Sequence, residues 1–366
     1  MIISLDKKIL GEAVNTVSRF SERKVLSLPA LSGIAFVAEK DSITLRATNL
    51  ETGIEMSIEG SIRTEGAVAL PSAVFRDITS SLSGSGAVSL ETKGDTLVLS
   101  TDKGKSTLKT LSYEDMPSLS SPEHPKTSFS IQGAVLRSLI GSVAGYASPS
   151  TVRPELASIF LSAEGGVLKA VATDSFRLAE KKVSVGGKVS PFSILIPAKN
   201  ALDIMQVIPD SDIELNADEH QCSFKWDTGR VVSRLVSMQY PDYAQIIPKS
   251  FSAEATVLKK DFESALKRAS VFSDSFQKVR LALESKDKKV SLSARNTDIG
   301  ESSEDVSAAI TGEALELSFN HRYLHAPLSS MTAESITLSA AGIGRPLVIR
   351  GQGDASFLYL VMPMNQ

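Results

Sequence analysis

One pair of residues in this 366-residue chain has the types and spacing of a metal site. His321 and His325 are four residues apart, which places two imidazoles on the same face of a helix, as in zinc-binding motifs. The glutamate that would follow the first histidine is replaced by Arg322, and Pro327 is expected to kink or end the helix just beyond. We therefore interpret the pair as polar surface histidines and expect no metal.

Candidate nucleophiles are equally sparse. The pattern S-x-x-K is too short to be specific and occurs by chance in a Ser-rich chain; the copies at 106–109 and 275–278, among others, have no partner motifs around them. No phosphate-binding glycine loop, G-x-S-x-G or H-E-x-x-H is present, and the carboxylates are scattered. The single cysteine, Cys222, cannot form an internal disulfide and is interpreted as structural. The sequence thus predicts a protein that is not an enzyme and has no cofactor.

Composition and charge restrict where the protein can act. The chain is 42% hydrophobic and 22% charged, which is typical of globular domains. The N-terminal segment 1–14 carries acids and bases where a signal peptide is apolar, and no apolar run approaches the roughly 18 residues of a membrane span. We expect a cytoplasmic protein. Because the net charge is −3, any role on nucleic acid requires a local basic face.

The elements that would build such a face are organised in a long repeat. The segment 43–49 alternates apolar and polar residues and ends in a polar turn, as a half-buried strand does. The same pattern returns at 168–174 and 290–296, offset by 125 and then 122 residues. Three matching tails, at Tyr113–Pro117, Tyr240–Tyr243 and Tyr359–Pro363, keep a similar interval. We interpret the chain as three tandem copies of one domain, at 1–122, 123–248 and 249–366.

Each copy is predicted to contain two helices. The first begins the copy, at 5–20, 131–146 and 257–272, with apolar stripes that start at Leu5, Ile131 and Leu258. The second spans 71–83, 197–208 and 320–331, and its stripe in the first copy is Val74, Ile78 and Leu82. With seven or eight strands around them, these helices suit an α+β domain with helices on one face of an antiparallel sheet. Open sheet edges would pair with the next domain, and repeated joining in one sense closes a ring.

The charge is divided unevenly between helices and strands. The six predicted helices contain eleven bases and six acids, a net charge of +5, whereas the remainder carries −8. A ring with its helices inside would therefore have a basic lumen and an acidic exterior. The alternative is that solvated helix faces simply favour lysine and arginine, and the charge pattern alone leaves both interpretations open.

Specific motifs resemble those of the bacterial DNA polymerase III beta sliding clamp family. They are Ala172-Thr-Asp-Ser-Phe-Arg-Leu-Ala179, Tyr240-Pro-Asp-Tyr243 followed by Ile247-Pro248, and the terminal Val361-Met-Pro-Met364. The resemblance spans the whole chain. It implies a head-to-tail homodimer of three-domain subunits, a six-domain ring on duplex DNA that tethers the replicative polymerase as its processivity factor. It also implies a cytoplasmic, nucleoid-associated, non-catalytic subunit that an ATP-driven clamp loader opens and closes.

Three sets of residues follow from this resemblance. The first is an apolar pocket for short linear peptides of polymerases, loader and repair proteins, comprising Leu156, Thr173, Ser175, Phe176, Arg177, Leu178, Pro241, Ile246, Pro346, Leu360, Val361, Met362, Pro363 and Met364. The second is a basic set facing DNA, comprising Lys8, Arg19, Arg23, Lys24, Arg137, Arg153, Lys260, Lys267 and Arg268. The third is the dimer contact, in which Lys103, Lys105 and Leu108 face Val271, Phe272, Glu301 and Glu304 of the partner.

The chain departs from the family pattern in three places. Pro154-Glu155 stands where enterobacterial members have aromatic residues, Ser175-Phe176 replaces Gly-His, and Asn365-Gln366 replaces a basic-apolar ending. We therefore expect a shifted peptide preference and an altered DNA contact near Arg153. Two other functions remain open on sequence grounds: a clamp-like peptide-binding scaffold that does not load on DNA, and an unrecognised β-rich enzyme.

Overall fold

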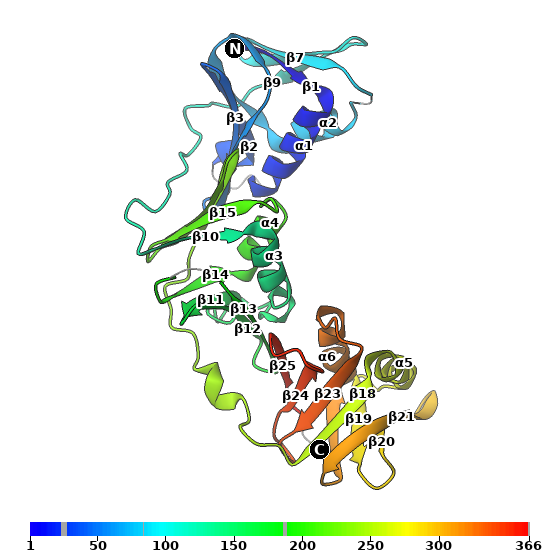
Figure 1. Ribbon diagram of the computed structural model, residues 1–366. Coiled ribbons are helices and arrows are strands. Elements are labelled where there is room, and N and C mark those ends of the chain that lie inside the picture. Colours follow the sequence, from blue (N-terminus) through cyan, green and yellow to red (C-terminus); the bar gives the residue numbers. More distant parts are fainter. Residues whose placement is uncertain (23–27, 83, 186–188, 365–366) are drawn as a thin grey trace. The chain divides into compact units, whose positions relative to one another are not determined.

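The repeat predicted from the sequence is visible in the order of the elements. The computed structural model describes residues 1–22, 28–82, 84–185 and 189–364. Within these residues a strand and a helix, four or five strands, a second helix and three strands follow one another three times (Figure 1). Repeat 1 comprises β1 Ile2–Asp6, α1 Lys7–Val17, β2 Gly33–Glu39, β3 Ser42–Thr48, β4 Thr52–Ile58, β5 Ser61–Thr64, β6 Gly66–Pro71, α2 Ser72–Ser80, β7 Ala87–Lys93, β8 Thr96–Ser100 and β9 Lys105–Lys109.

The other two repeats keep this order without an equivalent of the short strand β5. Repeat 2 comprises β10 Thr127–Gln132, α3 Gly133–Gly141, β11 Ser158–Glu164, β12 Val167–Thr173, β13 Arg177–Ser184, β14 Phe192–Pro197, α4 Ala198–Met205, β15 Asp212–Ala217, β16 Gln221–Trp226 and β17 Gly229–Arg234. Repeat 3 comprises β18 Ala253–Leu258, α5 Lys259–Ser270, β19 Lys278–Glu284, β20 Lys289–Asn296, β21 Gly300–Gly312, β22 Leu315–Asn320, α6 His321–His325, β23 Ser335–Ala340, β24 Leu347–Gly351 and β25 Phe357–Val361. The predicted strands at 43–49, 168–174 and 290–296 are β3, β12 and β20.

Contacts divide the chain into two compact units, each with its own sheets. Unit 1 is 1–138 with 199–237, and unit 2 is 139–198 with 238–366. Unit 1 contains a five-stranded sheet in the order β5-β1-β7-β8-β9 and an eight-stranded sheet in the order β10-β15-β16-β17-β4-β3-β2-β6. Unit 2 contains one twelve-stranded sheet, β14-β11-β12-β13-β25-β24-β23-β18-β21-β20-β19-β22. Both of the larger sheets combine strands of neighbouring repeats.

These crossings confirm that sheet edges of neighbouring repeats pair. Strand β17 of repeat 2 pairs antiparallel with β4 of repeat 1, with Ser233 opposite Thr52. Strand β25 of repeat 3 pairs antiparallel with β13 of repeat 2, with Val361 opposite Arg177. Each junction therefore joins the last strand of one repeat to the strand after the polar turn of the previous one, by main-chain hydrogen bonds.

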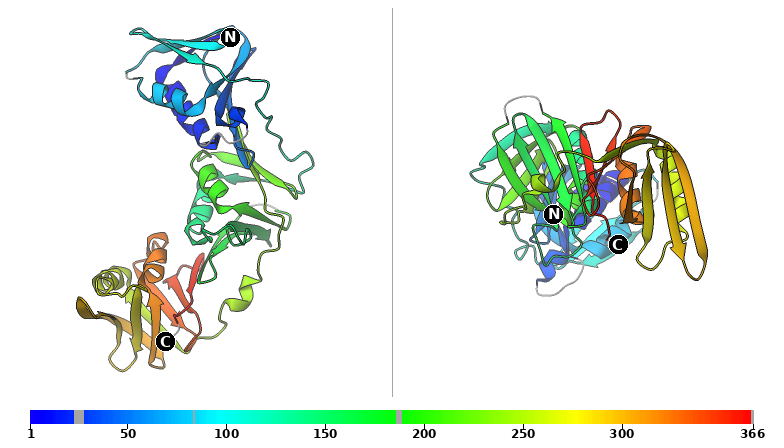
Figure 2. Two further views of the ribbon diagram at one scale, coloured as in Figure 1. Left: turned by 180° about the vertical axis from the view of Figure 1, so that it is seen from behind. Right: turned by 90° about the horizontal axis from the view of Figure 1, so that it is seen from below.

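Helices cover one face of the strands in each unit. In repeat 1, α1 and α2 lie side by side (Figure 1; Figure 2, left), and α1 packs against β3 and β4 through the buried Leu10 and Val14. In repeat 3, α5 packs against β18, β20 and β21 through Phe262 and Leu266, and α6 packs beside it. The opposite helix faces carry the polar residues, as expected for amphipathic helices.

The predicted helix boundaries were wrong at their first residues. Each repeat begins with a strand, and Leu5, Ile131 and Leu258 lie in β1, β10 and β18. Leu5 is buried because it alternates with Ile3, whereas Leu258 is 54% exposed because Val257 faces the core. An apolar residue just before a helix fits a helical stripe as well as a strand, so spacing alone could not separate the two.

The apolar stripe of the second helix in repeat 1 was also misplaced. Val74 is 52% exposed, and α2 instead buries Ser72, Phe75 and Thr79. The ring of Phe75 packs edge-to-face on Phe36 of β2, with the centroids 5.4 Å apart, and so fixes the rotation of the helix. In repeat 3 the expected effect of Pro327 is observed, since α6 ends at His325 and the chain continues as a 3₁₀ turn over Ala326–Ser330.

Candidate functional site

The motifs at 172–179 and 361–364 meet in unit 2. Strand β13 starts at Arg177 and β25 ends at Val361, and these two residues lie opposite each other in the sheet. Leu178 lies opposite Leu360 in the same ladder. Pairing of the two strands therefore places the polar turn before β13 next to the tail after β25.

The turn before β13 is held by its own side chains. Asp174 Oδ1 accepts hydrogen bonds from the backbone N–H groups of Phe176 and Arg177, both at 3.0 Å. Thr173 Oγ1 donates to the Arg177 carbonyl at 2.7 Å and accepts from Ser175 N–H at 3.2 Å. Ser175 adopts a φ of 78°, a left-handed conformation that costs a residue with a Cβ about 1 kcal/mol. This arrangement leaves the Phe176 ring 61% exposed at the tip.

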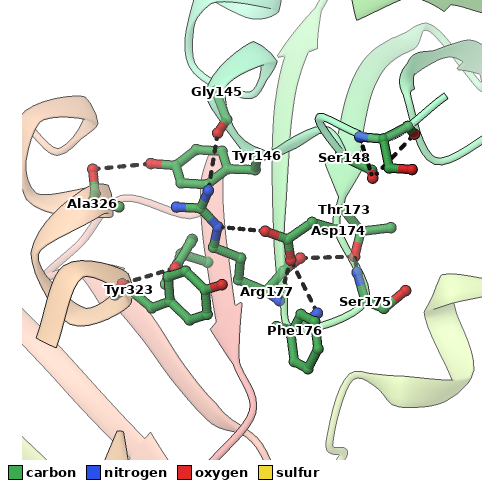
Figure 3. Close-up of polar contacts among 12 residues, drawn as sticks. Gly145, Tyr146, Ser148, Thr173, Asp174, Ser175, Phe176, Arg177, Tyr323 and Ala326 are labelled. Atoms are coloured by element: carbon green, nitrogen blue, oxygen red, sulfur yellow. Dashed lines mark hydrogen bonds and ion pairs between the residues drawn. The ribbon is translucent and has the colours of Figure 1, made fainter. Parts of the chain in front are cut away.

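Arg177 joins the turn to helix α6. Its guanidinium group lies between two aromatic rings, 5.3 Å from the Tyr146 centroid and 4.7 Å from the Tyr323 centroid (Figure 3). Its Nε donates to Asp174 Oδ2 at 2.9 Å, and an Nη atom donates to the Gly145 carbonyl at 3.3 Å. Charge-assisted bonds in one plane and ring contacts on both faces fix the side chain in a single orientation.

The two tyrosines are themselves anchored to repeat 3. Burial raises the pKa of the Tyr146 phenol, so its hydroxyl stays protonated and donates to the Ala326 carbonyl at 3.1 Å (Figure 3). The Tyr359 hydroxyl donates to the Tyr323 carbonyl at 2.8 Å, and its ring packs on Tyr146 with the centroids 5.1 Å apart. These contacts make repeat 2 and repeat 3 one structural unit at this point.

The C-terminal tail extends this arrangement. Met362 N–H donates to the Phe176 carbonyl, and Met364 N–H donates to the Ser318 carbonyl of β22, both at 2.8 Å. The side chains of Met362, Pro363 and Met364 are partly exposed. The tail thus lies between the turn of repeat 2 and the edge strand of repeat 3, with apolar atoms open to solvent.

An aromatic cluster supports the loop that carries Pro241 and Ile246. The rings of Phe160 and Tyr240 stack with centroids 4.9 Å apart, and Tyr243 packs edge-on against both. The Tyr243 hydroxyl donates to the buried carboxylate of Glu180 at 2.6 Å. This cluster holds the loop on the outer side of the sheet, where the Ile246 side chain is 48% exposed.

The structure sorts the fourteen predicted pocket residues by exposure. Four side chains are exposed, those of Ser175, Phe176, Pro241 and Ile246. Five are partly exposed, those of Arg177, Pro346, Met362, Pro363 and Met364. Five are buried, those of Leu156, Thr173, Leu178, Leu360 and Val361, so in this structure they support the surface from beneath.

Three residues that belong to this region were missed by the sequence analysis. Tyr146 and Tyr323 hold Arg177, and no local signal separates them from other core tyrosines. Phe276 is 71% exposed on the loop before β19, the strand that pairs with β22. An aromatic residue in the polar segment 273–277 was the one available sign.

Most of the basic residues predicted to face DNA have partners within the chain. Arg268 pairs with Glu304 at 2.7 Å, and Arg153 Nε pairs with Glu155 at 2.8 Å. The remaining contacts of this set join Arg137 to Asp210 and to the Ile208 carbonyl, Arg19 to Gln206, and Lys8 to Glu12 at 3.9 Å. Lys260 and Lys267 are exposed on α5, and Arg23 and Lys24 lie outside the described residues.

The residues predicted for the dimer contact lie on two sheet edges. Strand β9, with Lys105 and Leu108, is the edge of the five-stranded sheet, and Lys103 lies in the turn before it. Leu108 is already buried in its own sheet. Val271 is 64% exposed after α5, and the first half of β21, with Glu301 and Glu304, pairs with β20 alone.

Metal chemistry finds no support in the described part of the chain, where no cluster of three or more metal-ligating side chains occurs. His321 Nε2 lies 2.8 Å from Gln277 Oε1, and His325 Nε2 lies 3.4 Å from Glu263 Oε1. Cys222 is fully buried, and burial raises the pKa of its thiol. Among the described residues, no helix has the length and apolarity needed to cross a membrane.

Comparisons with known proteins match the whole chain. Three family models match consecutive segments: the DNA polymerase III beta subunit N-terminal domain at 1–120, its central domain at 130–242 and its C-terminal domain at 244–365. A beta sliding clamp of Synechococcus elongatus is 28% identical, with 92% of each chain covered. One of Streptococcus pneumoniae is 27% identical, with 99% of this chain and 98% of the relative covered.

Solved structures show the same fold. The DNA polymerase sliding clamp of Bacillus subtilis superimposes with a TM-score of 0.94 at 26% identity, and the alignment covers 100% of this chain and 99% of that one. A sliding clamp of Pseudomonas aeruginosa bound to griselimycin gives a TM-score of 0.95 at 23% identity, with 100% of each chain covered.

Proposed function

Because the chain belongs to the family of DNA polymerase III beta subunits, the bacterial sliding clamps, we propose that two copies join head to tail into a ring that encircles duplex DNA. The protein is a non-catalytic processivity factor of DNA polymerase with a peptide-binding pocket. In our proposal a clamp loader opens the ring, and the replicative polymerase and other proteins with a clamp-binding motif share the pocket. The domains are placed at 1–122, 123–248 and 249–366.

The observation that carries the ring is the repeated junction between sheets. The last strand of repeat 2 pairs with β4 of repeat 1, and the last strand of repeat 3 pairs with β13 of repeat 2. The last strand of repeat 1, β9, has an open edge, and so does the first half of β21, the equivalent of β4 and β13. A third junction of the same kind, between two subunits, would use both of these edges and close the ring.

The internal repeat also supplies a register for this third junction. Thr52 and Arg177, the junction residues of β4 and β13, are equivalent positions, and their counterpart in repeat 3 is Gly300, which lies opposite Asn296 of β20. Within their own repeats, the partner residues Ser233 and Val361 lie opposite the buried Cys222 and Leu347 of the preceding strand. The counterpart of Cys222 and Leu347 in repeat 1 is Leu97, which lies opposite Leu108. We therefore place Leu108 opposite Gly300 of the partner subunit.

In this antiparallel register Lys103 lies opposite Asp305 of the partner subunit and Lys105 opposite its Ser303. Charge complementarity between the two ends favours a head-to-tail contact over a symmetric one, which would bring like charges together. Exposed ion pairs contribute only about 0 to 1 kcal/mol each. In this proposal, main-chain hydrogen bonds and the apolar Leu108, Val271, Phe272 and Ile299 supply most of the stability.

The electrostatics suit a ring that slides. Counterion release makes the affinity for DNA grow with the number of free cations that reach phosphates. In the described residues Arg137, Arg153 and Arg268 are already paired with carboxylates, so few cations remain to hold the duplex in one place. The proposed lining of Lys8, Arg19, Arg23, Lys24, Arg137, Arg153, Lys260, Lys267 and Arg268 would attract DNA without fixing its register.

The peptide pocket is proposed at the meeting point of the 174–177 turn, the 241–246 loop and the C-terminal tail. The exposed Phe176 and Ile246 and the partly exposed methionines of the tail offer apolar contact. Methionine side chains adapt to several ligand side chains, which suits a surface shared by many partners.

The function is tested by the length of DNA that the cognate polymerase synthesises in one binding event. With the protein and loader on a primed circular template, products should be far longer than with polymerase alone. Removal of residues 362–366 should abolish this gain and the binding of a polymerase peptide, and leave the dimer intact. Normal peptide binding by the truncated protein would contradict the pocket assignment.

A further inference from the structure

A buried lysine contacts the turn of the hairpin that carries the proposed dimer contact. Lys7, the first residue of α1, is only 6% exposed, and its Nζ donates to Asp102 Oδ1 at 2.7 Å. Asp102 lies in the turn between β8 and β9, 95 residues along the chain, and its side chain is 64% exposed. Lysine is almost never buried unless it is paired, so the environment of Lys7 calls for this partner.

The surrounding backbone brings Lys7 under the hairpin. Its N–H donates to the Gly86 carbonyl at 3.0 Å, which joins the start of α1 to the start of β7. Gly86 has a φ of 133°, and a Cβ at this position would lie 3.8 Å from Lys7 Nζ. Asp6 caps α1 by accepting from Lys8 and Ile9 N–H groups, so the helix start that carries Lys7 is itself fixed.

The turn that Asp102 occupies has its own hydrogen bonds but no covering element. Thr101 N–H donates to the Gly104 carbonyl at 2.9 Å, and Lys103 N–H donates to Thr101 Oγ1 at 3.3 Å. Asp102, Lys103, Gly104 and Lys105 are all exposed. The bond from Lys7 therefore connects an exposed edge hairpin to the core of its repeat.

We infer that Lys7 is a positioning residue for dimerisation, which holds the β8–β9 hairpin in place and neutralises the one acid next to Lys103. This inference rests on the proposed ring. The segment 101–109 contains Lys103, Lys105 and Lys109 against the single acid Asp102. With Asp102 paired to Lys7, Lys103 keeps its full charge for Asp305 of the partner subunit. Without Lys7, Asp102 would be free to pair with Lys103.

The role of Lys7 is tested by the dimer dissociation constant of K7M, which keeps the length of the side chain and removes its charge. We expect a rise of about tenfold, since a charge-assisted hydrogen bond to a buried group is lost. The dissociation constant should also rise less steeply with salt concentration, because the free Asp102 carboxylate cancels part of the Lys103 charge. K93M, in β7 of the same sheet with an exposed lysine, is the matched control and should dimerise as the wild type does.

D102N provides a second route if K7M does not fold. It should weaken the dimer and keep a salt dependence at least as steep as that of the wild type, since no acid remains beside Lys103. The double variant K7M/D102N should dimerise at least as tightly as K7M. Unchanged dissociation constants in K7M and D102N, or a double variant weaker than K7M by a further similar factor, would overturn the inference.

Hydrogen exchange separates this inference from the proposed ring. At concentrations where the protein is monomeric, the amides of 100–105 should exchange faster in K7M than in the wild type and K93M. Equal exchange in all three proteins would contradict the tether, whether or not the wild type dimerises. A wild type that stays monomeric at every concentration, with faster exchange in K7M, would contradict the ring and leave the tether supported.

Discussion

The guanidinium carbon of Arg177 lies 4.7 Å from the ring centroid of Tyr323 (Figure 3). Arg177 begins β13 in repeat 2, whereas Tyr323 lies in α6 of repeat 3. The contact thus adds a side-chain link between repeats 2 and 3 to the main-chain hydrogen bonds between β13 and β25. The geometry of the pocket proposed above depends on this link, since the exposed Phe176 belongs to the same turn as Arg177.

Replacing Arg177 with lysine should therefore weaken peptide binding. R177K keeps the positive charge and loses the planar contacts with two rings and the paired donation to Asp174 and Gly145, so we expect an affinity lower by about tenfold. Fluorescence anisotropy of a labelled peptide carrying the polymerase's clamp-binding motif measures it. R350K, an equivalent change on β24 of the same sheet, is the control. If R177K binds the peptide as tightly as R350K does, the contacts of Arg177 with the two tyrosine rings and Asp174 do not shape the pocket.

Freeing Arg153 should strengthen the contact with DNA. The Glu155 side chain is nearly buried, and its pKa is lowered by backbone hydrogen bonding and then by the Arg153 side chain. The carboxylate is therefore charged and forms an ion pair with Arg153. In E155Q this ion pair is lost, so the positive charge of Arg153 becomes available to a DNA phosphate. The slope of log affinity for linear duplex against log salt concentration should become steeper by about 0.9.

The matched control for this prediction is E164Q, which changes an exposed acid at the end of β11. Its slope should equal that of the wild type. Equal slopes for E155Q and the wild type would show that Arg153 does not reach the DNA.

The register proposed for the subunit contact predicts a specific disulfide. Lys105 and Ser303 of the partner subunit are placed opposite each other, so a K105C/S303C variant should form covalent dimers under mild oxidation. K105C/S302C, shifted by one residue, points one thiol to the other face of the strand and should cross-link poorly. Non-reducing electrophoresis measures the yield, and Cys222 does not interfere because it is fully buried. Preferential cross-linking of the shifted pair would contradict the register.

His321 should make the stability of unit 2 depend on pH. Burial, and then the nearby Arg322 and His325, lower the pKa of His321 below its usual 6.5. Below pH 6.5 the unfolded chain therefore binds a proton more readily than the folded one, and the free energy of unfolding falls as the pH drops through this range. H321N should lose part of this dependence, whereas H124N, at an exposed linker position, should keep it. Denaturant unfolding at pH 7.5 and 5.5 measures the difference, and identical pH dependence in H321N and the wild type would refute it.

Much of the fold was predictable because the chain repeats its strand pattern. Residues such as Ala47, Ala172 and Ala294 recur at nearly constant intervals, and all three are buried at equivalent places in β3, β12 and β20. Rotation of the helices was less predictable, since Phe75 rather than Val74 faces the core once a partner ring is present. Helical spacing gives an apolar face to within about one residue, and packing decides the rest.

The site was predictable only as far as its motifs reach. Sequence motifs placed Arg177 and Val361 together, and the structure pairs them across two strands. The rings of Tyr146 and Tyr323, which hold Arg177, are 177 residues apart in the sequence and belong to no motif. Likewise, a count of basic residues could not reveal that Arg153 and Arg268 form ion pairs with Glu155 and Glu304, because ion pairs depend on tertiary structure.

The central claim, a closed ring around DNA, is tested most directly by retention on circular and linear DNA. The protein is loaded by the clamp loader onto a nicked circular plasmid, purified by gel filtration, and the plasmid is then cut once at a restriction site. A closed ring should stay on the circle and leave once the circle is cut, since a topological link needs no tight contact. Equal retention on cut and uncut plasmid would contradict it.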